Sequence, residues 1–159
     1  ASGAVGTNAV QLARTLFGAQ VTGVCSAANV ELVQSLGASQ VVDYTREDFT
    51  QQEKSYDIVF DAVAKIPPHQ ARKVLKPNGI YLNVHRASHA TRNTTMLQDL
   101  LSLKELLEAG KLKPVIDRVY PLEEIVEAHR YVDAGHKKGN VVIMLGHKDS
   151  IHRLWFLSL

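Results

Sequence analysis

Hydrophobic positions fall into two patterns that alternate along the chain. Continuous apolar runs rich in β-branched and aromatic residues predict buried strands, and apolar positions three to four residues apart predict helices with one buried face. Strands are predicted at residues 20–25, 40–44, 56–62, 80–84, 115–120 and 140–145. Helices are predicted at residues 7–17, 27–36, 70–75, 96–110 and 123–134. Because strands and helices alternate over residues 1–84, we expect a doubly wound parallel sheet of the α/β class.

The first predicted helix follows a glycine-containing turn, residues 1–6, with Gly3 and Gly6 three positions apart. Its apolar stripe consists of Val5, Ala9, Leu12, Ala13 and Leu16. Glycines before a helix let a phosphate approach backbone N–H groups at the positive end of the helix dipole. A strand beyond that single helix is the second half of a βαβ unit. The turn is therefore predicted to bind a dinucleotide, in a Rossmann-like fold.

The strand that should lead into this turn is not in the sequence, because Ala1 already belongs to the turn. In a doubly wound sheet that strand is central, with a neighbour hydrogen-bonded on each side. We therefore expect a fragment whose sheet lacks its first strand. Its expected parts are an incomplete nucleotide-binding domain at 1–110, a C-terminal segment at 111–148 and a tail of unknown role at 149–159.

Composition narrows the possible partners. The net charge is +2 and 21% of residues are charged, so no nucleic-acid surface is expected. The single cysteine, Cys25, excludes an internal disulfide, and its place in an apolar run makes it a core residue. No signal peptide or 18-residue apolar run is visible, so no membrane partner is expected and the cytoplasm is the default compartment.

Several stretches together resemble one known family. They are residues 1–7 (ASGAVGT), 23–26 (GVCS), 30–33 (VELV), 36–38 (LGA), 42–44 (VDY), 56–63 (YDIVFDAV), 75–79 (LKPNG), 110–116 (GKLKPVI), 120–122 (YPL) and 138–142 (KGNVV). The chain resembles the medium-chain dehydrogenase/reductases, and within them the quinone oxidoreductase-like, zinc-binding-dehydrogenase-type proteins.

The resemblance implies an oxidoreductase that moves a hydride between NAD(P)H and a quinone, enone, aldehyde or alcohol. In this family an N-terminal catalytic domain supplies much of the substrate site and any zinc ligands, and segment 111–148 folds back onto it. No catalytic residue or metal ligand is expected in this chain, because the cofactor supplies the hydride and the protein orients it. His85 and His89 are four residues apart but have no third ligand nearby. The chain alone is expected to be inactive.

Three features depart from the family pattern. Ala4 and Ala64 stand where the family usually has glycine, and a methyl group there would crowd the pyrophosphate or the nicotinamide. Between Val84 and Leu97 the chain is too short for the helix and strand that the family has there. That strand often forms the family's dimer edge, so a homodimer is an open expectation. The tail at 149–159 has no family counterpart.

The cofactor is expected to be NADP, with NAD the alternative. NAD-binding proteins place a carboxylate at the end of the second strand, and this chain has Ser26 there, whose hydroxyl can donate to a 2′-phosphate. No Lys or Arg follows Ser26 directly, and Arg46 is the compensating cation. The expected cofactor-binding residues are Gly3, Ala4, Val5, Gly6, Ser26, Tyr44, Arg46, Val63, Ala64 and Asn140.

Some of these positions have an alternative structural interpretation. Tyr44 stacks on adenine or is a half-exposed aromatic, Val63 and Ala64 line the crevice or pack on the next helix, and Asn140 contacts the nicotinamide or caps a strand. Two other classes of function also stay open. Residues 56–60 and 74–80 resemble the later half of S-adenosylmethionine-dependent methyltransferases, although Ser26 stands where those need an acid. A non-catalytic nucleotide-binding module is the other class, because Ala4 and Ala64 would permit it.

Overall fold

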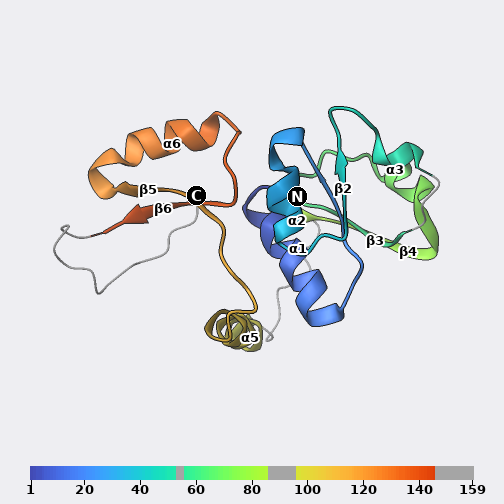
Figure 1. Cartoon of the computed structure of the whole chain (residues 1–159), viewed down its shortest axis with the longest axis horizontal. Helices are drawn as coiled ribbons and strands as arrows, with labels where there is room; N and C mark the ends of the chain where they lie inside the picture. Colours follow the sequence, from blue (N-terminus) through green and yellow to red (C-terminus); the bar gives the residue numbers. More distant parts are fainter. Residues whose placement is uncertain (53–55, 86–95, 146–159) are drawn as a thin grey trace.

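A computed structural model describes residues 1–52, 56–85 and 96–145 (Figure 1). The helices are α1 (Ala4–Phe17), α2 (Val30–Ser35), α3 (Pro68–Lys73), α5 (Met96–Glu108) and α6 (Ile125–Asp133). The strands are β1 (Thr22–Cys25), β2 (Gln40–Asp43), β3 (Tyr56–Asp61), β4 (Leu75–Asn83), β5 (Ile116–Pro121) and β6 (Asn140–Met144). Short 3₁₀ turns are η1 (Ala27–Asn29), η2 (Phe49–Gln51) and η3 (Leu122–Glu124). The order of elements follows the sequence expectation closely.

The strands form three separate parallel pairs, β1–β2, β3–β4 and β5–β6. Parallel strands joined through helices confirm the α/β class. No hydrogen-bonded ladder joins β1 to β3 within the described residues, so the expected doubly wound sheet is divided. In doubly wound sheets a central strand has a hydrogen-bonded neighbour on each side, and the described residues place no such strand between β1 and β3.

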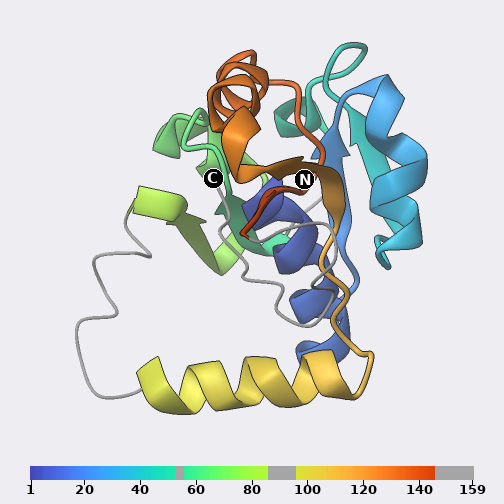
Figure 2. The ribbon, with the colours of Figure 1, turned by 90° about the vertical axis from the view of Figure 1, so that its left-hand side faces the viewer.

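The three pairs lie in two groups (Figure 1). The β5–β6 pair lies with α6 on one side, and β1 to β4 lie on the other side with α1, α2 and α3. Helix α5 lies apart from both groups, and Figure 2 shows it as a separate rod along one edge. Its leucines 97, 100, 101 and 107 are exposed. Of the apolar positions expected on one face of this helix, Leu100 and Leu107 are therefore exposed and Leu103 is half-buried.

Each strand pair has a small core of its own. Val10, Cys25, Val33 and Ala38 form the first cluster, around β1 and α2. The second consists of Val59, Ala71 and Val74, and the third of Ala128, Val141 and Ile143. Cys25 is a buried free thiol, as expected of a core cysteine, and burial raises its pKa.

Helix α1 differs from the prediction in its start and in its buried face. It begins at Ala4 rather than Thr7, so three residues of the glycine turn form its first turn. Its buried residues are Gly6, Thr7, Val10 and Gln11, and the predicted stripe was wrong, since Val5 and Leu16 are exposed. Val10 packs with Cys25 and Val33, and Gln11 bonds Lys113, so these contacts decide which face is buried.

Residues 76–79, which separate the predicted helix at 70–75 from the predicted strand at 80–84, lie within β4. Tyr56 pairs with Leu75 and Ile58 pairs with Ile80, so the intervening β4 residues bulge out of the ladder. A Cβ atom on Gly79 would lie 2.9 Å from the carbonyl oxygen of Tyr56. The bulge is therefore built on a close backbone approach that glycine permits. Most of the stretch between Val84 and Leu97, and the whole tail at 149–159, lie outside the described residues.

Candidate cofactor site

The start of α1 leaves backbone N–H groups available to an anion. Gly3 is the N-cap residue, in an extended conformation, and no side chain caps this end of the helix. The first helical hydrogen bond runs from the N–H of Thr7 to the carbonyl oxygen of Gly3, at 2.9 Å. The N–H groups of Ala4, Val5 and Gly6 precede that bond and have no acceptor within the helix, and no side chain caps them. Together with the helix dipole they favour a negatively charged group here.

The two glycines of the turn have different structural roles. A Cβ atom on Gly6 would lie 2.7 Å from backbone atoms of Ala1, so the chain itself requires glycine there. A Cβ atom on Gly3 would meet nothing within 4 Å, and the backbone angles of Gly3 suit any residue. The space beside Gly3 is therefore open, at the point where the N–H groups emerge. This open space leaves room for a ligand group beside Gly3.

Ser26, Tyr44 and Arg46 come together beyond the ends of β1 and β2. Cys25 pairs with Asp43 in the ladder, and the N–H of Tyr44 donates to the carbonyl oxygen of Cys25 at 3.0 Å. The residues that follow each strand therefore meet at one end of the pair. The Tyr44 side chain is 63% exposed, so its ring is accessible to a ligand. Exposure of this degree also agrees with the alternative of a surface aromatic.

The polar groups at this end already have partners among themselves. Asn29 Nδ2 donates to Ser26 Oγ at 3.0 Å, which leaves the serine proton to donate elsewhere. Hydrogen bonds from the side chain and N–H of Thr45 hold the pKa of the Asp43 carboxyl below its usual value. Arg46 Nε lies 3.9 Å from Asp43 Oδ2. The Arg46 cation is thus shared with a carboxylate, and the sequence did not predict this pairing.

The loop after β3 contains Val63 and Ala64 and is shaped by Asp61. Asp61 is 2% exposed; its carboxylate accepts from the N–H of Val63 at 3.1 Å and from the N–H of Ile66 at 2.7 Å. The Tyr81 hydroxyl lies 3.4 Å from the same carboxylate. Sequence reasoning did not select Asp61; its signal is a carboxylate directly after the apolar run 58–60, two residues before a loop amide that it binds.

Val63 and Ala64 then lie where the loop is most constrained. The Val63 side chain is 69% exposed, so it does not pack on the following helix as the structural alternative required. Ala64 has a φ of 53°, in the left-handed region that favours glycine. The family pattern of glycine at this position therefore has a backbone cause, and alanine occupies the same conformation at a cost.

Asn140 lies at the start of β6 and is buried. Its N–H and its side-chain Nδ2 donate to the carbonyl oxygen of Val115, at 2.7 and 3.1 Å. This is the strand-start bonding that the sequence alternative described. Gly139, one residue earlier, donates its N–H to the carbonyl oxygen of Ser2 at 2.8 Å. Asn140 therefore adjoins the glycine turn, although it is distant from it in sequence.

Neither the histidines nor a depression beside β4 offers a better site. No group of three metal-ligating side chains occurs within residues 1–52, 56–85 and 96–145, and His89 lies outside these ranges. A shallow depression of about 310 Å³ is lined by Pro68, Arg72, Leu75, Gly79, Ile80 and Tyr81. It adjoins the amino-terminal part of β4, whereas ligands of parallel α/β sheets bind beyond the carboxyl ends. The glycine turn therefore stays the candidate cofactor site.

Comparison with known proteins decides the family. The family profile described as "Zinc-binding dehydrogenase" matches residues 36–143, more than half of the chain. The chain belongs to the zinc-binding dehydrogenase family. This confirms the resemblance seen in the sequence, and the methyltransferase alternative is set aside.

Curated relatives of this zinc-binding dehydrogenase chain include two plant enzymes. A 2-methylene-furan-3-one reductase of Solanum lycopersicum is 36% identical over 152 residues, covering 89% of this chain and 38% of that protein. An NADPH-dependent alkenal/one oxidoreductase of Arabidopsis thaliana is 34% identical, with the same coverage. Among solved structures, a quinone oxidoreductase from Coxiella burnetii superposes with a TM-score of 0.76 at 28% identity, over 89% of this chain and half of that one. The chain thus spans half or less of the length of these relatives.

Proposed function

We propose that this chain is the cofactor-binding portion of an NAD(P)H-dependent oxidoreductase that reduces a quinone or an enone. The observation that carries the proposal is the uncapped start of α1 beside the open space at Gly3. The chemistry of a diphosphate fits bare N–H groups at a positive helix end. The names of the relatives, which include alkenal/one and quinone oxidoreductases, support the same class of reaction.

In this proposal the chain binds and orients the cofactor. The N–H groups of Ala4, Val5 and Gly6 hold the pyrophosphate, Tyr44 lies against the adenine, and Val63 and Ala64 line the nicotinamide side. A bound nicotinamide supplies the hydride, and no side chain of this portion is assigned a catalytic role. The remaining length of the relatives is proposed to correspond to an N-terminal catalytic domain that supplies the substrate site.

NADPH is the proposed form of the cofactor. Ser26 offers a hydroxyl donor rather than a repelling carboxylate at the end of β1, and Arg46 supplies the cation. Because Arg46 is 84% exposed and shared with Asp43, its contribution to 2′-phosphate binding is expected to be small. We expect Arg46→Ala to weaken NADPH binding about two- to fivefold and leave NADH binding unchanged. Arg72→Ala, on the exposed face of α3, is the matched control and should change neither.

Two further proposals concern the assembly and the cell. A dimer of the family type would depend on residues that include 86–95, and these lie outside the described ranges. A homodimer therefore stays a proposal. No described helix has the length and apolar character needed to cross a bilayer. The cytoplasm is the proposed compartment, on the basis of the single buried free thiol. Some relatives are named as chloroplastic or mitochondrial proteins.

Titration calorimetry on the 159-residue chain tests the proposal. NADPH should bind, NADH should bind more weakly, and S-adenosylmethionine should give no heat of binding. A quinone with NADPH should show no turnover on this chain alone. Tight binding of S-adenosylmethionine, or no binding of either nicotinamide cofactor, would overturn the proposed function.

A further inference from the structure

A buried glutamine joins α1 to the linker of residues 109–115, which connects α5 to β5. Gln11 is 7% exposed, and its side-chain amide bonds the main chain of Lys113 in both directions. Nε2 donates to the carbonyl oxygen of Lys113 at 2.9 Å, and the N–H of Lys113 donates to Oε1 at 2.9 Å. A side-chain amide that pairs both ways with one residue fixes the orientation of that residue as well as its distance. Gln11 therefore determines where the linker begins its path into β5.

The linker in turn fixes the start of β6. Val115, two residues after Lys113, accepts two hydrogen bonds from Asn140 through its carbonyl oxygen. Gly139 has a φ of 66°, and a Cβ atom there would lie 2.3 Å from that same oxygen. The contact between the two segments is thus too close for any side chain at Gly139.

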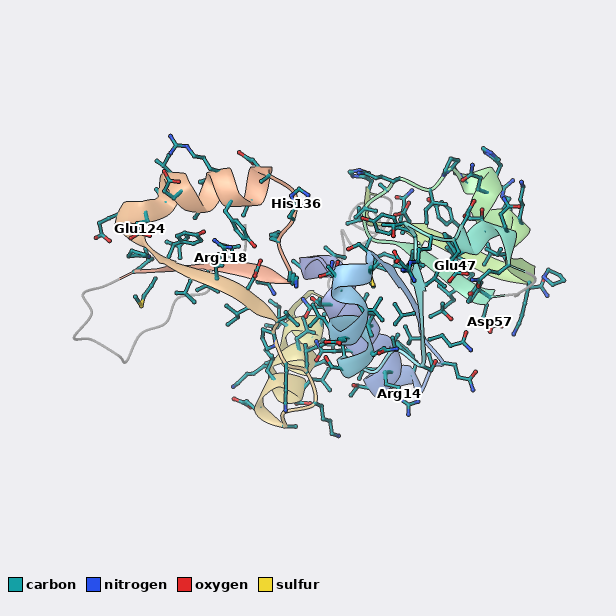
Figure 3. All side chains as sticks on the ribbon, turned by 45° about the horizontal axis from the view of Figure 1, so that its top comes forward. Arg14, Glu47, Asp57, Arg118, Glu124 and His136 are labelled. Carbon is teal, nitrogen blue, oxygen red and sulfur yellow. The ribbon has the colours of Figure 1, made fainter. Side chains whose placement is uncertain are left out.

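The residue before β6, Gly139, contacts the residues that lead into α1. The N–H of Gly139 bonds the carbonyl oxygen of Ser2, and Gly139 pairs with Gly3 in an isolated parallel bridge. Ser2 and Gly3 lead directly into α1, which carries Gln11. In Figure 3 the loop marked by His136 runs from α6 back toward this helix. A ring of main-chain contacts thus joins the glycine turn, the linker and the start of β6, with one side chain, Gln11, as its buried link.

We propose that Gln11 is a positioning residue that holds Gly139 and Asn140 in register with the glycine turn. The role rests on the proposed function, because the ring brings Asn140 beside the turn that would bind the pyrophosphate. Gln11 is too buried to touch a cofactor itself. It acts through Lys113 and Val115, and it thereby sets the distance between the glycine turn and Asn140, the residue that the sequence places on the nicotinamide side as one of two alternatives.

A pair of ligands separates positioning from general stability. NADPH reaches both ends of the site, whereas 2′,5′-ADP lacks the nicotinamide half. Gln11→Met keeps the length and helix propensity of the side chain but removes both bonds to Lys113. We expect it to weaken NADPH binding about five- to tenfold and to change 2′,5′-ADP binding less than twofold. Gln11→Glu, which still accepts from the Lys113 N–H, should give an intermediate loss and replaces the methionine variant should that variant fail to fold.

Thr15 offers a matched control on the same helix. Its hydroxyl donates to the carbonyl oxygen of Lys111 at 3.4 Å, at the exposed start of the same linker. Thr15→Val removes this long, solvent-exposed bond, and the affinities for both nucleotides should stay as in the unaltered chain. Amide hydrogen exchange adds a readout that needs no ligand. In Gln11→Met, exchange should become faster at Lys113, Gly139 and Asn140 and stay unchanged in β1 and β2.

The outcomes distinguish this proposal from the one on which it rests. Equal loss of NADPH and 2′,5′-ADP binding in Gln11→Met, or unchanged exchange at Gly139, would overturn the positioning role alone. Failure of the unaltered chain to bind either nucleotide would overturn the proposed function, and the positioning role with it. A selective loss of NADPH binding together with faster exchange at Gly139 would establish both.

Discussion

The backbone amides of two loops in the candidate site differ in whether a side chain of the protein accepts their hydrogen bonds. At the glycine turn, residues 1–6, no side chain caps the start of α1, and the space beside Gly3 is open. In the loop after β3, a buried carboxylate, Asp61, accepts from two loop amides and lies near the Tyr81 hydroxyl. The first loop has no side-chain acceptor for its amides, whereas two amides of the second loop donate to a buried carboxylate.

The difference assigns separate tasks to the two loops. A loop whose amides are unsatisfied gains most from an anionic ligand, because the ligand replaces water at the positive end of a helix. A loop whose amides are satisfied by a buried acid is held in one shape without a ligand. We therefore infer that the glycine turn binds the phosphate and that the loop of residues 61–66 is a preformed wall of the site.

The largest expected loss of stability follows a substitution in the loop of residues 61–66. Asp61→Ala leaves two loop amides without their buried acceptor and should lower the free energy of unfolding by roughly 3 kcal/mol. Urea unfolding followed by circular dichroism measures this. Asp48→Ala is the matched control, because Asp48 accepts from the N–H and hydroxyl of Thr50 in a similar turn but is exposed. An equal loss in the two variants would contradict the special role of the buried acid.

The next largest effect on stability is expected at Gly6, and it contrasts with Gly3 in the same glycine turn. Gly6→Ala forces its new Cβ atom against the backbone of Ala1, at 2.7 Å before any movement. We expect a loss of about 1–3 kcal/mol in the free energy of unfolding, because backbone must shift to make room. Gly3→Ala meets no such contact and should change stability by less than about 1 kcal/mol. Similar losses in both variants would show that the turn is not open at Gly3.

The smallest expected change in stability is a gain, at Ala64 in the loop of residues 61–66. Ala64 has a left-handed backbone, and Ala64→Gly should raise the free energy of unfolding by about 1 kcal/mol. Ala62→Gly, two residues earlier and without a positive φ, should lower it by about 0.5–1 kcal/mol. Thermal and urea unfolding of the two variants give the comparison. A loss of stability in Ala64→Gly would contradict the strain assigned to this position.

Much of the fold could be predicted because its elements are local. The order of strands and helices followed from the spacing of apolar residues, and Gly3 and Gly6 marked the start of α1. The predicted apolar stripe of α1 failed, because the buried face depends on Lys113, a residue about one hundred positions away. Contacts of that range leave no periodic signal in the sequence.

The same limit applies to the site. Ser26 and Tyr44 could be expected at one edge because each follows directly after a strand, and Arg46 lies two residues beyond Tyr44. Their part in cofactor binding stays a prediction. Asp61 and Gln11 were missed because a buried polar residue looks like any other polar residue until its partners are known. The pairing of Arg46 with Asp43 was also missed, and it lowers the expected contribution of Arg46 to cofactor choice.

The most direct test fills the start of α1 with a side chain of the protein's own. Gly3→Asp places a carboxylate at the N-cap position, where it can accept from the amides that the account assigns to the pyrophosphate. Asn8→Asp makes the same change of charge one turn later on α1 and serves as the control. We predict that Gly3→Asp raises the free energy of unfolding by about 1 kcal/mol and weakens NADPH binding more than tenfold, while Asn8→Asp leaves binding near that of the unaltered chain. NADPH binding in Gly3→Asp equal to that of the unaltered chain would contradict the account.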